Sequence, residues 1–214
     1  MQERILKRLK ITSHVSFRHL AIFCLDGSGS MQALSYGKIS KADYVSSEIH
    51  DVFSRMKSSR FREAYSFAIV NYDHRAKVVM PPTLAKDIDD EDARQYNPTL
   101  GFGGAQFISE GLMKAQELAE QFLDQATQGG LFYSVTILVI SDGGDMNRPK
   151  TVNLVKQLKE RPGVQIAGCF VETQGTEPEE LRSRSEYIKS ICSQERLFSR
   201  VSNSETLRGL FLFS

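Results

Sequence analysis

Short apolar runs bounded by polar turns recur along the chain and alternate with longer amphipathic stretches. The runs are rich in β-branched and aromatic residues and bounded by glycine, proline or polar residues, which predicts strands. The predicted strands lie at 20–25, 65–72, 76–80, 133–140, 164–171 and 197–201. Asp73-His-Arg75 predicts a hairpin turn that makes 76–80 an antiparallel edge strand, closed by Pro81-Pro82.

Apolar residues spaced three and four apart predict helices between these strands. The helical stretches lie at 41–57, 106–125, from about 149 to 158, at 177–193 and after Ser204, with a short basic helix near the amino terminus. Strands that alternate with helices predict an α/β fold: a doubly wound, mostly parallel sheet with one antiparallel edge strand and helices on both faces. We expect residues 1–17 to be an extension that docks as a helix and residues 18–214 to form one domain.

The first predicted strand runs into Asp26-Gly-Ser28-Gly-Ser30, a loop with an oxygen side chain at every second position. The intervening glycines allow a tight turn, so that the three side chains can converge on one point. Hard oxygen ligands with one formal charge among them suit Mg²⁺ or Mn²⁺ rather than zinc or copper. Taken alone, the motif is more typical of an ordinary turn that caps a helix than of a metal site.

Two further loops carry polar or glycine residues where a predicted strand ends or a predicted helix begins. The strand at 133–140 leads into Ser141-Asp142-Gly143, which places a second carboxylate at a strand's carboxyl end. Between the two lies a glycine-rich loop, 100–107, that opens a helix. In an open α/β sheet, ligands bind outside the carboxyl ends of the strands, so the three loops can share one crevice.

These three loops resemble those of a von Willebrand factor A domain, in which they form a metal-ion-dependent adhesion site. The resemblance covers the chain from about Arg18 onward. It implies that Asp26, Ser28, Ser30 and Asp142 are the metal-binding residues. It further implies that the serines coordinate directly, that the aspartates bind directly or through water, and that an acidic side chain of a partner protein completes the octahedron.

The middle loop departs from the family pattern. The family usually has a threonine after the paired glycines, where this chain has Ala105, which offers no ligand. Gln106 could offer a carbonyl oxygen, whereas the hydroxyl of Thr99 comes before the glycines and is out of register. Because Mg²⁺ readily keeps several waters, we expect a site of low affinity, and the missing threonine affects the family's ligand-triggered switch more than metal binding.

Composition restricts the partners. The net charge is +1 over 214 residues, which gives no electrostatic case for nucleic acid or an anionic membrane. Cys24, Cys169 and Cys192 show no paired spacing and are expected to be reduced and buried. The sequence shows no secretory signal and no membrane span, so we expect a cytoplasmic protein.

Enzymatic motifs are incomplete. The glycine loop lacks the lysine of a P-loop, the first loop lacks the third glycine of a dinucleotide site, and no nucleophile elbow surrounds its serines. His14, His19, His50 and His74 lie in no loop assigned to the crevice. The acidic run 87–92 lacks the spacing of a calcium loop. A metal-dependent phosphohydrolase is the best enzymatic alternative, but it lacks a carboxylate two residues after Asp26.

The predicted function is therefore a metal-dependent protein-binding module, not an enzyme. The alternative is a metal-independent scaffold in which Ala105 signals a degenerate site. The architecture also resembles stand-alone bacterial members of the family, including those of tellurite-resistance and stress or defence operons. That resemblance implies an adaptor whose partners are kinases, phosphatases or AAA+ ATPases.

Overall fold

A six-stranded sheet forms the centre of the fold, as a computed structural model shows for residues 17–35, 39–89, 96–125 and 131–201. The strand order is β3-β2-β1-β4-β5-β6, and every neighbouring pair is parallel except β2 and β3. The strands are β1 (Phe17–Asp26), β2 (Tyr65–Tyr72), β3 (Ala76–Leu84), β4 (Phe132–Ser141), β5 (Val164–Val171) and β6 (Phe198–Val201). The predicted mostly parallel sheet with an antiparallel edge strand is confirmed.

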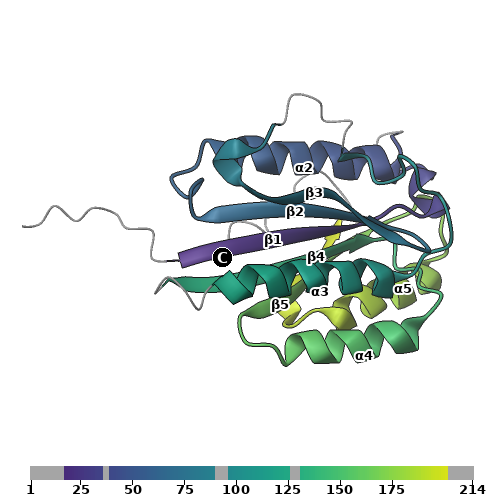
Figure 1. The fold of residues 1–214 in the computed structure, drawn as a ribbon. Coiled ribbons are helices and arrows are strands. Elements are labelled where there is room, and N and C mark those ends of the chain that lie inside the picture. Colours follow the sequence, from purple (N-terminus) through teal and green to yellow (C-terminus); the bar gives the residue numbers. More distant parts are fainter. Residues whose placement is uncertain (1–16, 36–38, 90–95, 126–130, 202–214) are drawn as a thin grey trace, which may run out of the picture.

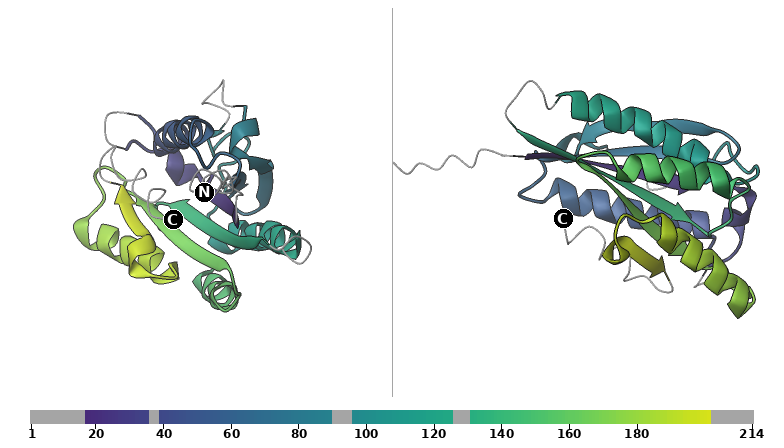
Figure 2. Two further views of the ribbon diagram at one scale, coloured as in Figure 1. Left: turned by 90° about the vertical axis from the view of Figure 1, so that its left-hand side faces the viewer. Right: turned by 90° about the horizontal axis from the view of Figure 1, so that it is seen from below.

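Helices cover both faces of this sheet, as predicted (Figures 1 and 2). They are α2 (Lys41–Lys57), α3 (Ile108–Asp124), α4 (Arg148–Lys159) and α5 (Pro178–Ile191), with short 3₁₀ turns η1 (Gly29–Gln32), η3 (Ala85–Asp87) and η6 (Glu195–Leu197). The apolar face of α2 packs on one side of the sheet around Phe23, Phe53 and Phe67. The other three helices pack on the opposite side. Each helix thus buries one apolar stripe.

The edge strand differs from the prediction. β3 continues through Pro81 and Pro82 to Leu84 instead of ending at the prolines. Its pairing with β2 shifts register between Phe67 and Ile69, so the prolines lie in a bulge. A bulge on an edge strand tolerates residues that cannot donate a backbone hydrogen bond. The predicted amino-terminal helix and the helix after Ser204 lie outside the described residues.

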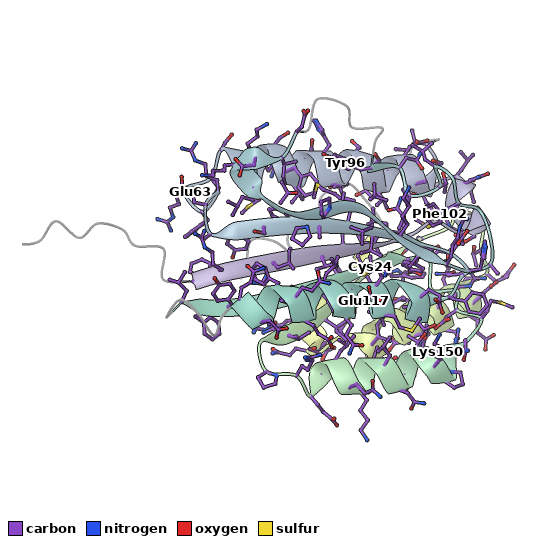
Figure 3. The ribbon with its side chains drawn as sticks, viewed as in Figure 1. Cys24, Glu63, Tyr96, Phe102, Glu117 and Lys150 are labelled. Carbon is purple, nitrogen blue, oxygen red and sulfur yellow. The ribbon has the colours of Figure 1, made fainter. Side chains whose placement is uncertain are left out.

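The sheet reverses its winding direction between β1 and β4. Both strands are buried and run in parallel, with Leu25 of β1 opposite Ile140 of β4. The loops that follow β1, β2 and β4 therefore gather at one end of the sheet, on the right in Figure 1. Figure 3 labels Phe102 at this end and Glu63 at the opposite end. Such a switch point is where open α/β sheets bind ligands.

The cysteines lie where the sequence predicts. Cys24, Cys169 and Cys192 are free and buried. Among the helices that can be described, none has the length and apolarity needed to cross a membrane.

Candidate metal centre

The first loop brings its three oxygen side chains together. Asp26 ends β1 and is fully buried, and its Oδ1 accepts a hydrogen bond from the Ser28 backbone N–H at 2.9 Å. The Ser28 and Ser30 hydroxyl oxygens lie 3.0 Å apart. The other carboxylate oxygen, Asp26 Oδ2, is buried and has no hydrogen-bond partner among the described residues. A buried carboxylate oxygen without a donor is costly, and a cation would satisfy it.

Glycines let the first loop lie directly against the middle loop. The Gly27 N–H donates to the Tyr72 carbonyl at 2.7 Å, and the Gly29 N–H donates to the Gly104 carbonyl at 3.4 Å. A Cβ atom at Gly27 would lie 2.6 Å from the Pro98 carbonyl oxygen. The glycine at position 27 is thus required for space.

The middle loop supplies no side-chain ligand. Ala105 is exposed, and the Thr99 hydroxyl donates to Asn97 Oδ1 at 2.7 Å within its own turn, in line with its register before the glycines. The buried Gln106 amide donates to Ser141 Oγ at 2.6 Å, and its backbone carbonyl accepts from the Met146 N–H at 2.9 Å. Gln106 therefore ties the middle loop to the third loop as a positioning residue.

Asp73, which the sequence placed only in a hairpin turn, holds the middle loop in position. Its Oδ2 accepts from the Gly103 N–H at 3.3 Å and the Gly104 N–H at 3.0 Å. Burial alone would raise the pKa of Asp73, but these donors and the Arg75 N–H hold it below its usual value. His74 Nδ1 lies 3.1 Å from Asp73 Oδ1, beside Gly104. His74 thus lies in the hairpin turn, as predicted, and the structure adds that this turn is next to the middle loop.

The third loop places Asp142 beside the first loop. Asp142 is buried, and its Oδ1 accepts from the Gly144 N–H at 3.4 Å. Its charge acts on Asp26, and Ser30 donates a hydrogen bond to it, so all four predicted residues lie together. A second feature of Asp142 could not be read from the sequence: the Lys41 ammonium lies 2.7 Å from Asp142 Oδ2.

Other residues of the third loop have structural roles. Asn147 Oδ1 accepts from the Lys150 N–H at 3.3 Å and caps α4. Asp145 Oδ2 accepts from the Thr151 hydroxyl at 2.7 Å and also from Tyr187. The carboxylate of Asp145 is thus committed to holding the loop against α4 and α5.

The two buried carboxylates have opposite electrostatic surroundings. Burial, and then the neighbouring Asp142, raise the pKa of Asp26 to about 7. Burial would also raise the pKa of Asp142, but the Lys41 ammonium and hydrogen bonds from Lys41 and Ser30 bring it below its usual value. Asp142 is consequently the ionised member of the pair at neutral pH, while Asp26 titrates near it. A cation that binds Asp26 would displace its proton.

The donor set fits a hard divalent cation in part. Asp26 offers a free oxygen, and two hydroxyls lie next to it. Asp142 is already paired with a lysine. In the described chain, no three His, Cys, Asp or Glu side chains come together as a metal site. Metal binding here therefore depends on serine oxygens, which suit Mg²⁺ or Mn²⁺.

Comparison with known proteins gives one family. Residues 21–144 match the family model of the von Willebrand factor type A domain. This stretch includes all three loops. No curated protein sequence matches the chain.

Solved structures share the fold at low sequence identity. The pilus adhesin SpaC of Lactobacillus rhamnosus GG has a TM-score of 0.67 at 10% identity over 88% of this chain and 28% of that protein. The PilB minor pilin of Streptococcus sanguinis gives 0.62 at 11% identity over 89% of this chain and 58% of the pilin. BatB of Bacteroides thetaiotaomicron gives 0.57 at 18% identity over 86% of this chain and 90% of BatB. This chain thus spans less than two thirds of both pilus proteins.

Proposed function

The chain belongs to the von Willebrand factor type A domain family, and from this premise we propose that it is a protein-binding module whose site is the loop cluster at the carboxyl ends of β1 and β4. The observation that carries the proposal is the buried Oδ2 of Asp26, which has no partner among the described residues and belongs to the loop whose two serine hydroxyl oxygens lie 3.0 Å apart. The loops around it are held by backbone hydrogen bonds to Asp73 and Gln106. Such preorganisation lowers the cost of binding.

In this proposal Asp26, Ser28 and Ser30 hold a Mg²⁺ or Mn²⁺ ion, and Asp142 contributes directly or through water. Bound there, the ion supplies positive charge that attracts a carboxylate of the partner protein. Ala105 contributes no oxygen, which leaves positions for water and lowers the expected affinity.

Exposed apolar side chains on the same loops support a protein partner. Leu34 follows η1, Leu100 lies in the middle loop and Met146 in the third loop, with 52%, 61% and 72% of their surface exposed. Large exposed apolar residues beside a polar centre are typical of protein interaction sites. We propose that they contact the residues that flank the partner's acidic side chain.

A metal-independent scaffold is the second candidate, and the Lys41–Asp142 pair favours it. A lysine 2.7 Å from Asp142 Oδ2 already neutralises one of the two carboxylates. In this form of the function, the exposed side chains of Leu34, Leu100 and Met146 bind the partner without a metal ion.

The remaining parts of the proposal follow from the family resemblance. We propose no catalytic activity, since His74, the histidine next to the middle loop, is exposed and paired with Asp73. A cytoplasmic adaptor role in a bacterial stress or defence system, with kinases, phosphatases or AAA+ ATPases as partners, is proposed on the same ground.

Calorimetric titration of Mg²⁺ and Mn²⁺ into chelator-treated protein tests the metal. We expect saturable binding by the wild type and none by Asp26→Ala, because that variant lacks the only carboxylate oxygen of the site that has no partner among the described residues. The exposed Asp124→Ala, at the far end of α3, is the matched control and should bind like the wild type.

The same titration separates the two candidates. Equal binding by the wild type and Asp26→Ala would place the metal elsewhere and contradict the proposed site. No binding by the wild type, even with a millimolar acidic peptide present, would reject the metal-dependent form in favour of the scaffold.

A further inference from the structure

Two features of the position of Lys41 disfavour a lysine there, namely its burial and its place at the start of a helix. Its side chain is fully inaccessible to solvent, which an ammonium group avoids unless it is paired. It is also the first residue of α2, where the helix dipole repels positive charge. Since neither burial nor helix position favours a lysine here, the contacts of its ammonium group must explain why the residue is a lysine.

The start of α2 fixes the position of this lysine. Ser40 caps the helix by accepting from the Asp43 N–H at 3.0 Å, and the Lys41 N–H donates to the Ala33 carbonyl at 3.0 Å. Asp43 Oδ1 also accepts from the Asn97 amide at 2.7 Å, which ties α2 to the middle loop. The ammonium is therefore directed into the loop cluster by a well-anchored backbone.

Both hydrogen-bond partners of the ammonium belong to loops at the carboxyl ends of strands. Lys41 Nζ donates to Asp142 Oδ2 at 2.7 Å and to the Thr173 hydroxyl, after β5, at 2.6 Å. Asp142 is one of the two carboxylates that the family resemblance assigns to the metal. A cation of the chain itself thus neutralises a carboxylate that a divalent ion would otherwise neutralise.

We propose that Lys41 is a resident cation that competes with the divalent ion for Asp142. Resting on the proposed function, this inference adds how the metal affinity of the site is set. With Lys41 on Asp142, the charge of the carboxylates is partly cancelled and attraction for Mg²⁺ is weak. Thr173 can keep one hydrogen bond to the ammonium when a metal takes Asp142, so the exchange leaves Lys41 partnered.

The competition also keeps the site folded when no divalent ion is bound. Asp26 and Asp142 interact unfavourably, since the charge of Asp142 adds to burial, the larger cause, in raising the pKa of Asp26. Without Lys41, two buried carboxylates would face each other, and among the described residues the remaining ion-pair partner of Asp142 would be Arg184, at 4.0 Å. Removing one partner of a buried ion pair is strongly destabilising.

Lys41→Met tests the proposal by calorimetry and by thermal unfolding, with and without Mg²⁺. We expect Mg²⁺ to bind this variant at least tenfold more tightly than the wild type, because Asp142 is freed. In chelator, we expect its Tm to fall by about 10 °C, and Mg²⁺ should restore most of that loss. Lys114→Met, which removes a surface lysine paired with Glu117, should change neither quantity appreciably.

Each outcome separates this inference from the proposed function. Binding by the wild type with equal or weaker binding by Lys41→Met would overturn the competition and leave the metal site standing. Binding by Lys41→Met alone would support the competition and show that the wild-type lysine excludes the metal. If neither protein binds metal, the competition and the metal-dependent form of the proposed function both fail, and the metal-independent scaffold remains.

If Lys41→Met does not fold in chelator, the double variant Lys41→Met/Asp142→Asn removes the cation and its carboxylate together. It should recover stability without metal and bind Mg²⁺ no more tightly than the wild type. Tighter binding by the double variant would overturn the assignment of Asp142 as the contested group.

Discussion

Replacing Gly27 by alanine is expected to reduce the free energy of unfolding by about 2–3 kcal/mol, through overpacking. The added Cβ would lie 2.6 Å from the Pro98 carbonyl oxygen and 2.9 Å from Phe102 Cβ. One of these groups is backbone, so the first and middle loops must separate. Separation of the loops would also weaken the hydrogen bond from the Gly27 N–H to the Tyr72 carbonyl. Mg²⁺ binding should weaken in parallel.

Urea unfolding of Gly27→Ala and Gly101→Ala provides the comparison. Gly101 has a φ of +78° and nothing within 4 Å of an added Cβ, so its substitution costs only backbone strain, about 1 kcal/mol. If Gly27→Ala reduces the free energy of unfolding no more than Gly101→Ala does, the close packing of the two loops is contradicted.

Replacing Asp26 by asparagine is expected to stabilise the chelator-treated protein at neutral and higher pH while abolishing metal binding. The carboxylate is fully buried, and its Oδ2 has no partner in the described chain. An uncharged amide of the same shape removes the cost of an ionised group and the repulsion from Asp142. A residue retained at a cost to stability is typical of a functional site.

The effect depends on pH with a defined sign. The pKa of Asp26 is about 7 in the folded protein against 3.8 as a free side chain, so the folded state holds its proton more tightly. This contribution to stability is complete below pH 3.8 and is lost as the pH rises to 7. The stability advantage of Asp26→Asn should therefore grow by roughly 2–3 kcal/mol between pH 5 and pH 8.

Urea unfolding in chelator at both pH values measures this difference. If the difference in free energy of unfolding between Asp26→Asn and the wild type is the same at pH 5 and pH 8, Asp26 does not titrate in this range. A variant that is less stable at pH 8 would show that the carboxylate has partners that stabilise its charged form.

The sequence was most informative where a periodic pattern coincides with a buried element. The α2 boundaries, 41–57, were predicted to the residue because the helix has a serine cap and an unbroken apolar stripe. The sequence predicts too short a β3 strand because proline is typical of strand ends, whereas an edge bulge accommodates the prolines here. The four candidate ligands were found because strand ends in a doubly wound sheet must meet at one edge.

The supporting contacts of the site could not be predicted in the same way. Asp73 looked like an ordinary turn residue, and its role arises only because β2 ends beside the middle loop. Lys41 is separated from Asp142 by 101 positions, and its place in the helical pattern is compatible with a solvated lysine. Such pairings depend on how distant segments pack, which no local pattern encodes.

Asp26, Ser28 and Ser30 are proposed to bind a divalent cation. Anomalous diffraction from a crystal of the wild-type protein soaked in Mn²⁺ tests this binding most directly. We predict one strong manganese peak within about 2.0–2.4 Å of oxygens of the two serines, next to Asp26, with Lys41 moved off Asp142. No peak at this position, with Lys41 still on Asp142, would contradict the account.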